Sequence, residues 1–289
     1  MVRTMDEAAG FASFLSFSLI GLNDQDRIEV PGTGFRIAPG LGLTAAHVAN
    51  ELFTKLALAE GMPMPRQQRK YEGVEVRAAE QEVSGITTDE LNGWWYIDAF
   101  FNSKLTDICL LMMSPGNDAA RRVDKRGGYL RWSLSAPLVD QRLYAFGYIK
   151  EQLRSVRTES QTEFEVEYTG STQRVIVTGV YPNGRRRQAL HVPAILGPSS
   201  SFDPATAPSF EVRGEISPSM SGGPVFNSDL LYGVVSRGLT ERDQYGVDRD
   251  VAGIAVLLRP LLEMAEVTNE LRNVHLANLI HQGKIGSMP

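Results

Sequence analysis

The sequence has little cysteine, no long apolar run and no excess of positive charge, and each absence excludes a class of protein. Cys109 is the only cysteine among 289 residues, so an intrachain disulfide cannot form, which suits a reducing compartment. The formal net charge is −5, which gives no general attraction to phosphate backbones or anionic membranes. We therefore expect neither a nucleic acid nor a membrane as a partner.

The most apolar stretch near the N-terminus, residues 8–22, is too short to cross a bilayer. It has about 15 residues, whereas a transmembrane helix needs about 20. The residues before it include Asp6 and Glu7 instead of the basic residues of a secretory signal. We interpret the stretch as a short helix followed by a first strand, and we expect a cytoplasmic protein.

The rest of the composition is that of an ordinary folded protein, with 43% hydrophobic and 22% charged residues. From about residue 11 to residue 180, short apolar or alternating runs are separated by glycine, proline, asparagine and aspartate. This pattern is typical of an antiparallel barrel or sandwich. Residues 55–92 break any period and are interpreted as an insertion in a loop, whereas apolar residues at helical spacing predict a helix over 259–289.

Three short segments, far apart in the sequence, each contain one residue of a candidate nucleophilic relay. The segments are TAAHV at 44–48, TDICL at 106–110 and SMSGGPV at 219–225. The candidate residues are His47, Asp107 and Ser221, in that order along the chain. Serine is a weak nucleophile until an adjacent base removes its proton, so the chemistry needs a histidine beside the serine and an acid that orients the histidine.

The order His, Asp, Ser resembles that of the chymotrypsin-like serine proteases, in particular their bacterial trypsin-like branch, because other triad families use a different order. Two flanking regions add to the resemblance: GTGFRI at 32–37 with GLTAAH at 42–47, and YGVVSRG at 232–238. The resemblance implies an all-β fold of two six-stranded antiparallel β-barrels of chymotrypsin type with a C-terminal helix. The expected units are an N-terminal lobe over 1–135, a C-terminal lobe over 136–258 and a helical segment over 259–289.

The resemblance also assigns chemical roles to the candidate residues. Ser221 would attack a carbonyl carbon, His47 would act as its base, and Asp107 would orient the His47 ring. The backbone N–H groups of Ser219 and Ser221 occupy the oxyanion-hole positions of the family, where they would stabilise developing negative charge. The implied reaction is hydrolysis of a peptide bond through an acyl-enzyme, with no cofactor and no metal.

Ser219 departs from the pattern of the family, in which glycine usually stands two residues before the nucleophile. A serine that must adopt a positive φ is strained by roughly 1–3 kcal/mol. The hypothesis is that the oxyanion hole is malformed at rest and that a partner or a substrate completes it. Met220 precedes the nucleophile where digestive relatives have aspartate, so activation by cleavage of the chain is not expected.

Residues near the expected primary specificity pocket leave two alternatives open. The strand with Ser236, Arg237 and Gly238 resembles the family strand that lines this pocket and pairs with the substrate backbone. Glu215 lies six residues before Ser221, where an acidic pocket floor would select basic side chains in the substrate. In the alternative, Glu215 faces solvent and Arg237 favours acidic residues of the substrate.

The most specific hypothesis is a trypsin-like serine endopeptidase that acts on protein or peptide substrates. A cytoplasmic peptidase of this kind needs control, so we also expect a regulatory protein partner, and the effector of a bacterial antiviral defence system is one such role. The alternative is a catalytically silent pseudoprotease that holds a peptide or protein in the groove beside Ser236. The complete set of His47, Asp107 and Ser221 favours the enzyme, whereas Ser219 favours the pseudoprotease.

Overall fold

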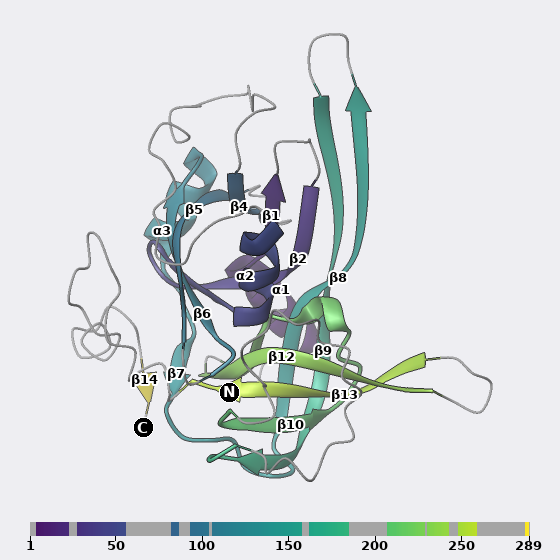
Figure 1. The fold of residues 1–289 in the computed structure, drawn as a ribbon. Helices are drawn as coiled ribbons and strands as arrows, with labels where there is room; N and C mark the ends of the chain where they lie inside the picture. The colour runs from purple at the N-terminus through teal and green to yellow at the C-terminus, as the bar shows by residue number, and fades with distance from the viewer. Residues whose placement is uncertain are drawn as a thin grey trace.

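The chain forms two β-sheet lobes that lie against each other (Figure 1). The computed structural model describes residues 4–22, 28–55, 82–86, 93–103, 106–157, 162–184, 207–228, 230–242, 248–258 and 287–288. The first lobe is a closed barrel with the strand order β1-β2-β3-β6-β5-β4. Its strands are β1 (Ser16–Leu22), β2 (Ile28–Ala38), β3 (Leu41–Thr44), β4 (Glu82–Ile86), β5 (Trp94–Asn102) and β6 (Cys109–Pro115). The six-stranded antiparallel barrel predicted for this lobe is therefore confirmed.

The second lobe is an eight-stranded sheet with the order β11-β8-β9-β10-β13-β12-β7-β14, in which β11 also pairs with β12. Its strands are β7 (Arg131–Ser133), β8 (Arg142–Arg157), β9 (Thr162–Tyr181), β10 (Ser209–Arg213), β11 (Pro224–Asn227), β12 (Leu230–Arg242), β13 (Asp248–Leu257) and β14 (Ser287–Met288). It differs from the expected six-stranded barrel because β7 and β14 extend the sheet in parallel beyond β12.

Two features expected from the sequence differ in the structure: the boundary between the lobes at residue 135 and the helix over 259–289. β7 precedes the expected lobe boundary at residue 135, yet it pairs with strands of the second sheet. The helix predicted for 259–289 is wrong at Ser287 and Met288, which pair with β7 as a strand because their backbone groups continue the edge of that sheet. Residues 259–286 of that helix, and most of the insertion at 55–92, lie outside the described residues.

Three α-helices are present in the part of the chain that the structure describes: α1 (Met5–Leu15), α2 (Ala46–Lys55) and α3 (Asp118–Arg126). At the start of α1, the Thr4 hydroxyl accepts from the Glu7 backbone N–H, and the Glu7 carboxylate accepts from the Thr4 N–H. This reciprocal capping box satisfies two donors that a helix N-terminus leaves free. The predicted helix followed by a first strand is confirmed as α1 and β1. No helix of the described chain is long and apolar enough to cross a bilayer.

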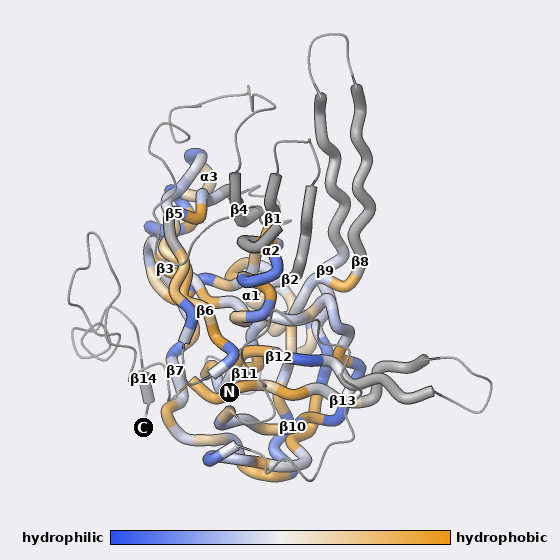
Figure 2. The backbone as a smooth tube through the Cα atoms, viewed as in Figure 1, coloured by the Kyte–Doolittle hydropathy of each residue, from blue (hydrophilic) through white to orange (hydrophobic). Residues whose placement is uncertain are grey.

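The largest apolar core joins α1 to both lobes. Ala8, Ala12 and Leu15 share one face of α1 and are fully buried, because they recur at the helical spacing of three to four residues. They belong to one cluster with Phe35 of β2 and Tyr148 of β8. Figure 2 shows the corresponding apolar stretches along β6, β12 and β13. The two lobes are thus held together by a shared core as well as by polar contacts.

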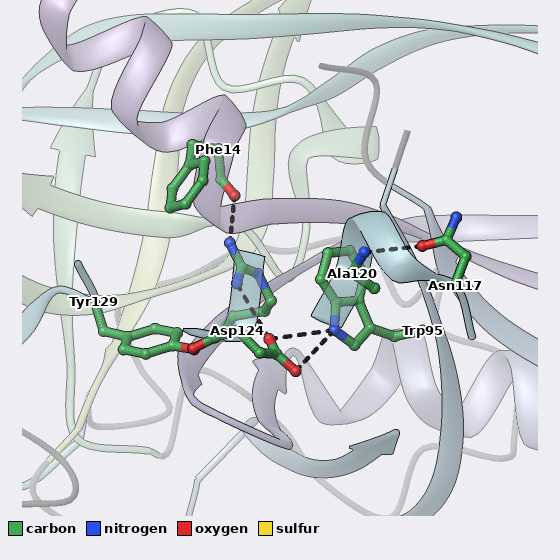
Figure 3. A network of polar contacts seen from close by, with 7 residues as sticks. Phe14, Trp95, Asn117, Ala120, Asp124 and Tyr129 are labelled. Atoms are coloured by element: carbon green, nitrogen blue, oxygen red, sulfur yellow. Dashed lines mark hydrogen bonds and ion pairs between the residues drawn. The ribbon is translucent and has the colours of Figure 1, made fainter. Parts of the chain in front are cut away.

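Arg36 of β2 is the centre of a buried network with Phe14 of α1 and Asp124 of α3, two members that are labelled in Figure 3. Its guanidinium donates to the Phe14 carbonyl oxygen at 2.6 Å and pairs with the Asp124 carboxylate of α3 at 3.4 Å. The rings of Phe14, Trp95 and Tyr129 surround it, with Cζ 5.0 to 5.7 Å from their centroids. A desolvated cation is attracted to aromatic faces in this arrangement, so the network fastens α1 and α3 to the barrel.

Burial changes the acid–base properties of two members of this network. It raises the pKa of the Asp124 carboxyl, and the hydrogen bond from Trp95 and the charge of Arg36 lower that pKa in part. Burial also raises the pKa of the Tyr129 hydroxyl to about 12, against a smaller opposing effect of Arg36. Tyr129 therefore stays neutral well above the usual range for tyrosine.

Candidate active site

The first part of the site is built where α2 begins against the turn that precedes β6. The Asp107 backbone carbonyl accepts from the Ala46 N–H at 3.3 Å, and Asp107 Oδ1 accepts from the His47 N–H at 2.9 Å. Asp107 Oδ2 lies 2.7 Å from His47 Nδ1. Because a carboxylate only accepts, Nδ1 donates in this contact, and in a neutral imidazole Nε2 then has the free lone pair. Asp107 thus fixes both the position and the tautomer of the His47 ring.

Burial distinguishes the two members of this pair. The Asp107 side chain is 3% exposed, whereas the His47 side chain is 31% exposed. A carboxylate so deeply buried needs its oxygens occupied by donors. The backbone N–H and the ring of His47 on α2 and the Ser236 hydroxyl on β12 are these donors. The histidine is held by the acid from one side while its other side is accessible.

Ser236 of β12 connects this pair to the second lobe. Its hydroxyl donates to Asp107 Oδ2 at 2.5 Å, and its backbone carbonyl accepts from the Ser221 hydroxyl at 3.3 Å. The Ser236 side chain was expected only beside the substrate, so its bond to Asp107 was missed by sequence reasoning. The available signal was a single polar residue at the end of the apolar run Gly233-Val234-Val235, where a buried hydroxyl needs a partner.

The loop that carries Ser221 is fastened to the first lobe. The Ser221 carbonyl accepts from the Thr33 N–H of β2 at 2.9 Å. Gly222 has a φ of 88°, and a Cβ there would lie 2.0 Å from the Thr33 carbonyl oxygen. A Cβ at Gly223 would lie 1.8 Å from the Phe146 carbonyl oxygen of β8. Both positions therefore require glycine, the first for its backbone conformation and close approach, the second for close approach alone.

Comparison with known proteins places this geometry in a family. Residues 32–231 match the model of the trypsin-like peptidase domain. The chain belongs to the trypsin-like peptidase family. The active form of an M. tuberculosis protease, Rv3671c, is similar in fold with a TM-score of 0.50 and 14% identity, covering 99% of this chain and 85% of that one. Kallikrein-related peptidase 10 aligns with a TM-score of 0.45 and 11% identity over 88% of this chain and 94% of that one. A search of curated proteins found no significant match.

The backbone N–H groups of Ser219 and Ser221, which were expected to form an oxyanion hole, do not converge in the structure. The Ser221 N–H donates to the Pro218 carbonyl oxygen at 3.1 Å, inside the 3₁₀ turn η3 (Pro218–Met220). The Pro218–Ser219 peptide is trans, so its C=O and N–H point in opposite directions. Because the Pro218 oxygen points at the Ser221 N–H, the Ser219 N–H points away from it. The two expected donors therefore do not face one common oxyanion position.

The candidate nucleophile Ser221 and the candidate base His47 are not hydrogen-bonded to each other in the described part of the chain. The Ser221 hydroxyl is directed to the Ser236 carbonyl, and within the described chain no hydrogen bond joins it to His47. The hydroxyls of Ser217 and Ser219 also lie 3.1 Å apart and share a hydrogen bond across the start of η3. The three candidate residues are thus connected through Asp107 and Ser236, without a direct hydrogen bond between Ser221 and His47.

The structure separates the residues expected near the specificity pocket. Glu215 is exposed, as in the solvent-facing alternative, and Ile216 beside it is buried. Arg237 and Gly238 are half-buried on β12, directly after the buried Ser236. No cluster of three or more candidate metal ligands occurs among the described residues.

Proposed function

We propose that this trypsin-like peptidase is a serine endopeptidase in which Ser221 is the nucleophile, His47 the base and Asp107 the orienting acid. The observation that carries the proposal is the double role of Ser236, whose side chain binds Asp107 and whose carbonyl binds Ser221. This residue links the His47–Asp107 pair of the first lobe to the nucleophile loop of the second. The apolar cores on either side of the lobe boundary do not need these polar contacts for their packing, which supports a functional role for them.

The proposed reaction follows from the free Nε2 of His47. Ser221 Oγ forms a bond to the substrate carbonyl carbon while its proton passes to Nε2, and collapse of the tetrahedral intermediate breaks the C–N bond. The same proton goes to the leaving amine nitrogen. Water then attacks the acyl-enzyme, passing one proton through Nε2 back to Ser221 Oγ, and releases the carboxylic acid. Asp107 stabilises the imidazolium that forms in both halves.

We also propose that the peptidase is latent in this conformation. Activation would rotate the Ser221 hydroxyl toward His47 and flip the Pro218–Ser219 peptide, so that the Ser219 N–H joins that of Ser221. A peptide flip takes φ of Ser219 from its negative value in η3 to a positive one, and a non-glycine residue is strained there by about 1–3 kcal/mol. The hydrogen bond between the Ser217 and Ser219 hydroxyls further stabilises the conformation before the peptide flip.

A fluorophosphonate probe tests this function, because it reacts with a serine activated by its base. We expect labelling of the wild type that is absent in Ser221→Ala. Ser219→Gly removes the strain of the flipped state and should label roughly 10-fold faster, in line with about 1–3 kcal/mol of strain. Ser219→Ala is the matched control, because it loses the hydroxyl contact to Ser217 and keeps the Cβ. Equal rates for the glycine and alanine variants would contradict the latency, and labelling that persists in Ser221→Ala would contradict the assigned nucleophile.

We propose that a regulatory protein partner supplies the free energy of the peptide flip. We also propose that the peptidase is the effector of a bacterial antiviral defence system. A cytoplasmic protease that switches on only with its partner fits the closed oxyanion region. Co-expression with the products of neighbouring genes should raise the labelling rate of Ser221. An unchanged rate with every neighbour would contradict this role.

The second candidate function is a pseudoprotease that binds peptides without cleaving them. It is favoured by the absence of a hydrogen bond between His47 and Ser221 in the described chain and by the unaligned Ser219 N–H. In that case neither the wild type nor Ser219→Gly would react with the probe. Peptide binding would be the same in the wild type and in Ser221→Ala.

A further inference from the structure

Thr33 of β2 is a fully buried polar residue at the boundary between the two lobes. Its backbone N–H donates to the Ser221 carbonyl oxygen at 2.9 Å, and its carbonyl oxygen accepts from the Thr44 hydroxyl at 2.7 Å. Its own hydroxyl accepts from the Tyr148 N–H of β8 at 3.0 Å. Thr33 thus connects the nucleophile loop, the strand β3 that leads to His47, and a strand of the second lobe.

Only one of these three contacts depends on the side chain at position 33. Every residue except proline has a backbone N–H and a carbonyl, so the contacts with Ser221 and Thr44 do not require threonine. The contact with Tyr148 does require a side-chain acceptor, because the accepting atom is Oγ1. Removing the acceptor of a buried donor costs about 1–3 kcal/mol. The contribution of the Thr33 hydroxyl can therefore be separated from that of the backbone.

Tyr148 is a well-anchored point of the second lobe. Its side chain is fully buried, its hydroxyl donates to the Ser16 carbonyl oxygen of β1 at 3.3 Å, and its ring packs edge-on against Phe146 with 5.4 Å between centroids. The pairing of β8 with β9 shifts register directly after it, between Tyr148 and Lys150. A shift of this kind disturbs the regular ladder of hydrogen bonds. The contact with Thr33 holds β8 at this place from the other lobe.

The nucleophile loop lies between the two strands that this hydrogen bond joins. On the side of β2, a Cβ at Gly32 would lie 2.7 Å from the Ser221 carbonyl oxygen. On the side of β8, a Cβ at Gly147 would lie 2.6 Å from the Cα of Met220. Backbone thus packs on backbone on both sides, with no side chain between that could change its rotamer to absorb a movement. The spacing of β2 and β8 therefore determines where Ser221 lies.

We propose that the Thr33 hydroxyl positions the nucleophile, because by joining β2 to β8 it holds Ser221 where its hydroxyl can reach His47. The inference rests on the proposed roles of Ser221 and His47. Thr33 is a positioning residue, since it touches none of the reacting atoms. Loss of its Oγ1 would let the two strands move apart, and a misplacement of about 1 Å can lower a rate about 100-fold.

The first test is the kinetics of fluorophosphonate labelling in Thr33→Val, which keeps the branched side chain and removes the hydroxyl. The maximal rate of Ser221 labelling should fall about 10- to 100-fold, whereas the probe concentration that gives half of this rate should change less than about 3-fold. Thr33→Ser restores an oxygen at the same place and should recover most of the rate. A rate in Thr33→Val within about 3-fold of wild type would overturn the proposal, as would an equal loss in Thr33→Ser.

Thr172→Val is the matched control, because the Thr172 hydroxyl of β9 is also buried and has no hydrogen-bond partner in the described chain. The same chemical change removes no contact there, so labelling should continue at the wild-type rate. Equal losses in the two valine variants would show a general effect of exchanging a buried hydroxyl for a methyl group and overturn the role of Thr33. If Thr33→Val does not fold, Thr33→Ala removes the same oxygen without adding a methyl group, and the same limits apply to it.

Hydrogen–deuterium exchange separates this inference from the proposed function, because it needs no reaction at Ser221. The Gly222 N–H in the nucleophile loop is hydrogen-bonded to the Val235 carbonyl at 2.7 Å. Exchange in residues 218–226 should be at least about 5-fold faster in Thr33→Val than in the wild type and the control.

Equal exchange in all three proteins would overturn the positioning role, and labelling of the wild type would then leave the peptidase standing. Faster exchange in Thr33→Val, with no labelling of the wild type, would support the link between Thr33 and the loop and contradict the peptidase.

Discussion

The first lobe contributes two carboxylates with little exposure to solvent, Asp107 at 3% and Asp124 at 13%, each beside a side chain that can carry positive charge. The two pairs differ in their surroundings. Arg36 is 1% exposed, whereas His47 is 31% exposed. Three aromatic rings surround the guanidinium of Arg36. The carboxylate beside His47 is instead contacted by a serine of the other lobe.

The difference shows that the residue types of a buried pair do not reveal its role. The Arg36–Asp124 pair is covered by aromatic rings, holds secondary structure in place and has no reacting group beside it. The pair with Asp107 engages only Nδ1 of the imidazole and accepts a hydrogen bond from a hydroxyl of the other lobe. Exposure and the neighbouring lobe, and not the charge pair alone, distinguish a candidate catalytic acid from a structural one.

Replacing Asp107 by Asn should have the largest effect. The amide can donate to Nδ1 and would hold the His47 ring in the wrong tautomer, and this change lowers kcat by about 10⁴ in the serine-protease template. The rate of fluorophosphonate labelling of Ser221 measures it, with thermal unfolding as the check on folding. A rate within 10-fold of wild type would contradict the assigned role of Asp107.

Arg36→Met should lower stability and leave the chemistry intact. Removing one partner of a buried ion pair leaves an uncompensated charge on Asp124, which costs about 3–5 kcal/mol of unfolding free energy. Urea unfolding measures the loss, and Ser221 in the folded fraction should label at the wild-type rate. The double variant Arg36→Met, Asp124→Leu should recover much of the stability; no recovery would show that the aromatic packing, and not the charge, is responsible.

Ser236→Ala should slow labelling of Ser221 more modestly. It removes a hydrogen bond to a charged acceptor, which contributes about 1.5–3 kcal/mol. The expected labelling rate is therefore roughly 10- to 100-fold lower. Ser209→Ala is a matched control, because Ser209 is fully buried on β10 and its hydroxyl has no partner among the described residues. An equal effect of both changes would contradict a positioning role for Ser236.

The smallest expected effect is a pH dependence from Asp124. Because burial raises its pKa in the folded protein, the folded state binds a proton more readily than the unfolded state between the ordinary carboxyl pKa and the raised one. Stability should therefore fall as pH rises through this window. Urea midpoints from pH 4 to 7 should show this slope in the wild type and lose it in Asp124→Asn. An identical slope in both proteins would assign the pH dependence to other groups.

The sequence pattern was sufficient to predict the elements that are specified by residues close together in the sequence. The capping residues Thr4 and Glu7 and the apolar positions after them specify α1, and the period of the strands specifies the barrel of the first lobe. The order of His47, Asp107 and Ser221, with the glycines that follow, was enough to predict the family. These features depend on neighbours in sequence and on backbone conformations that only certain residues adopt.

Other features arise only when distant segments meet. The bond from Ser236 to Asp107 spans the two lobes, and the Arg36 network brings together residues of α1, β2, β5 and α3. The packing of Ile216 against Gly253 likewise depends on how β13 is placed beside the segment that follows β10. Periodicity carries no information about such contacts, because it reports which face of an element is buried and not what buries it. Residue order thus indicated which chemistry to expect, and only the tertiary structure showed that Ser236 connects Asp107 to Ser221.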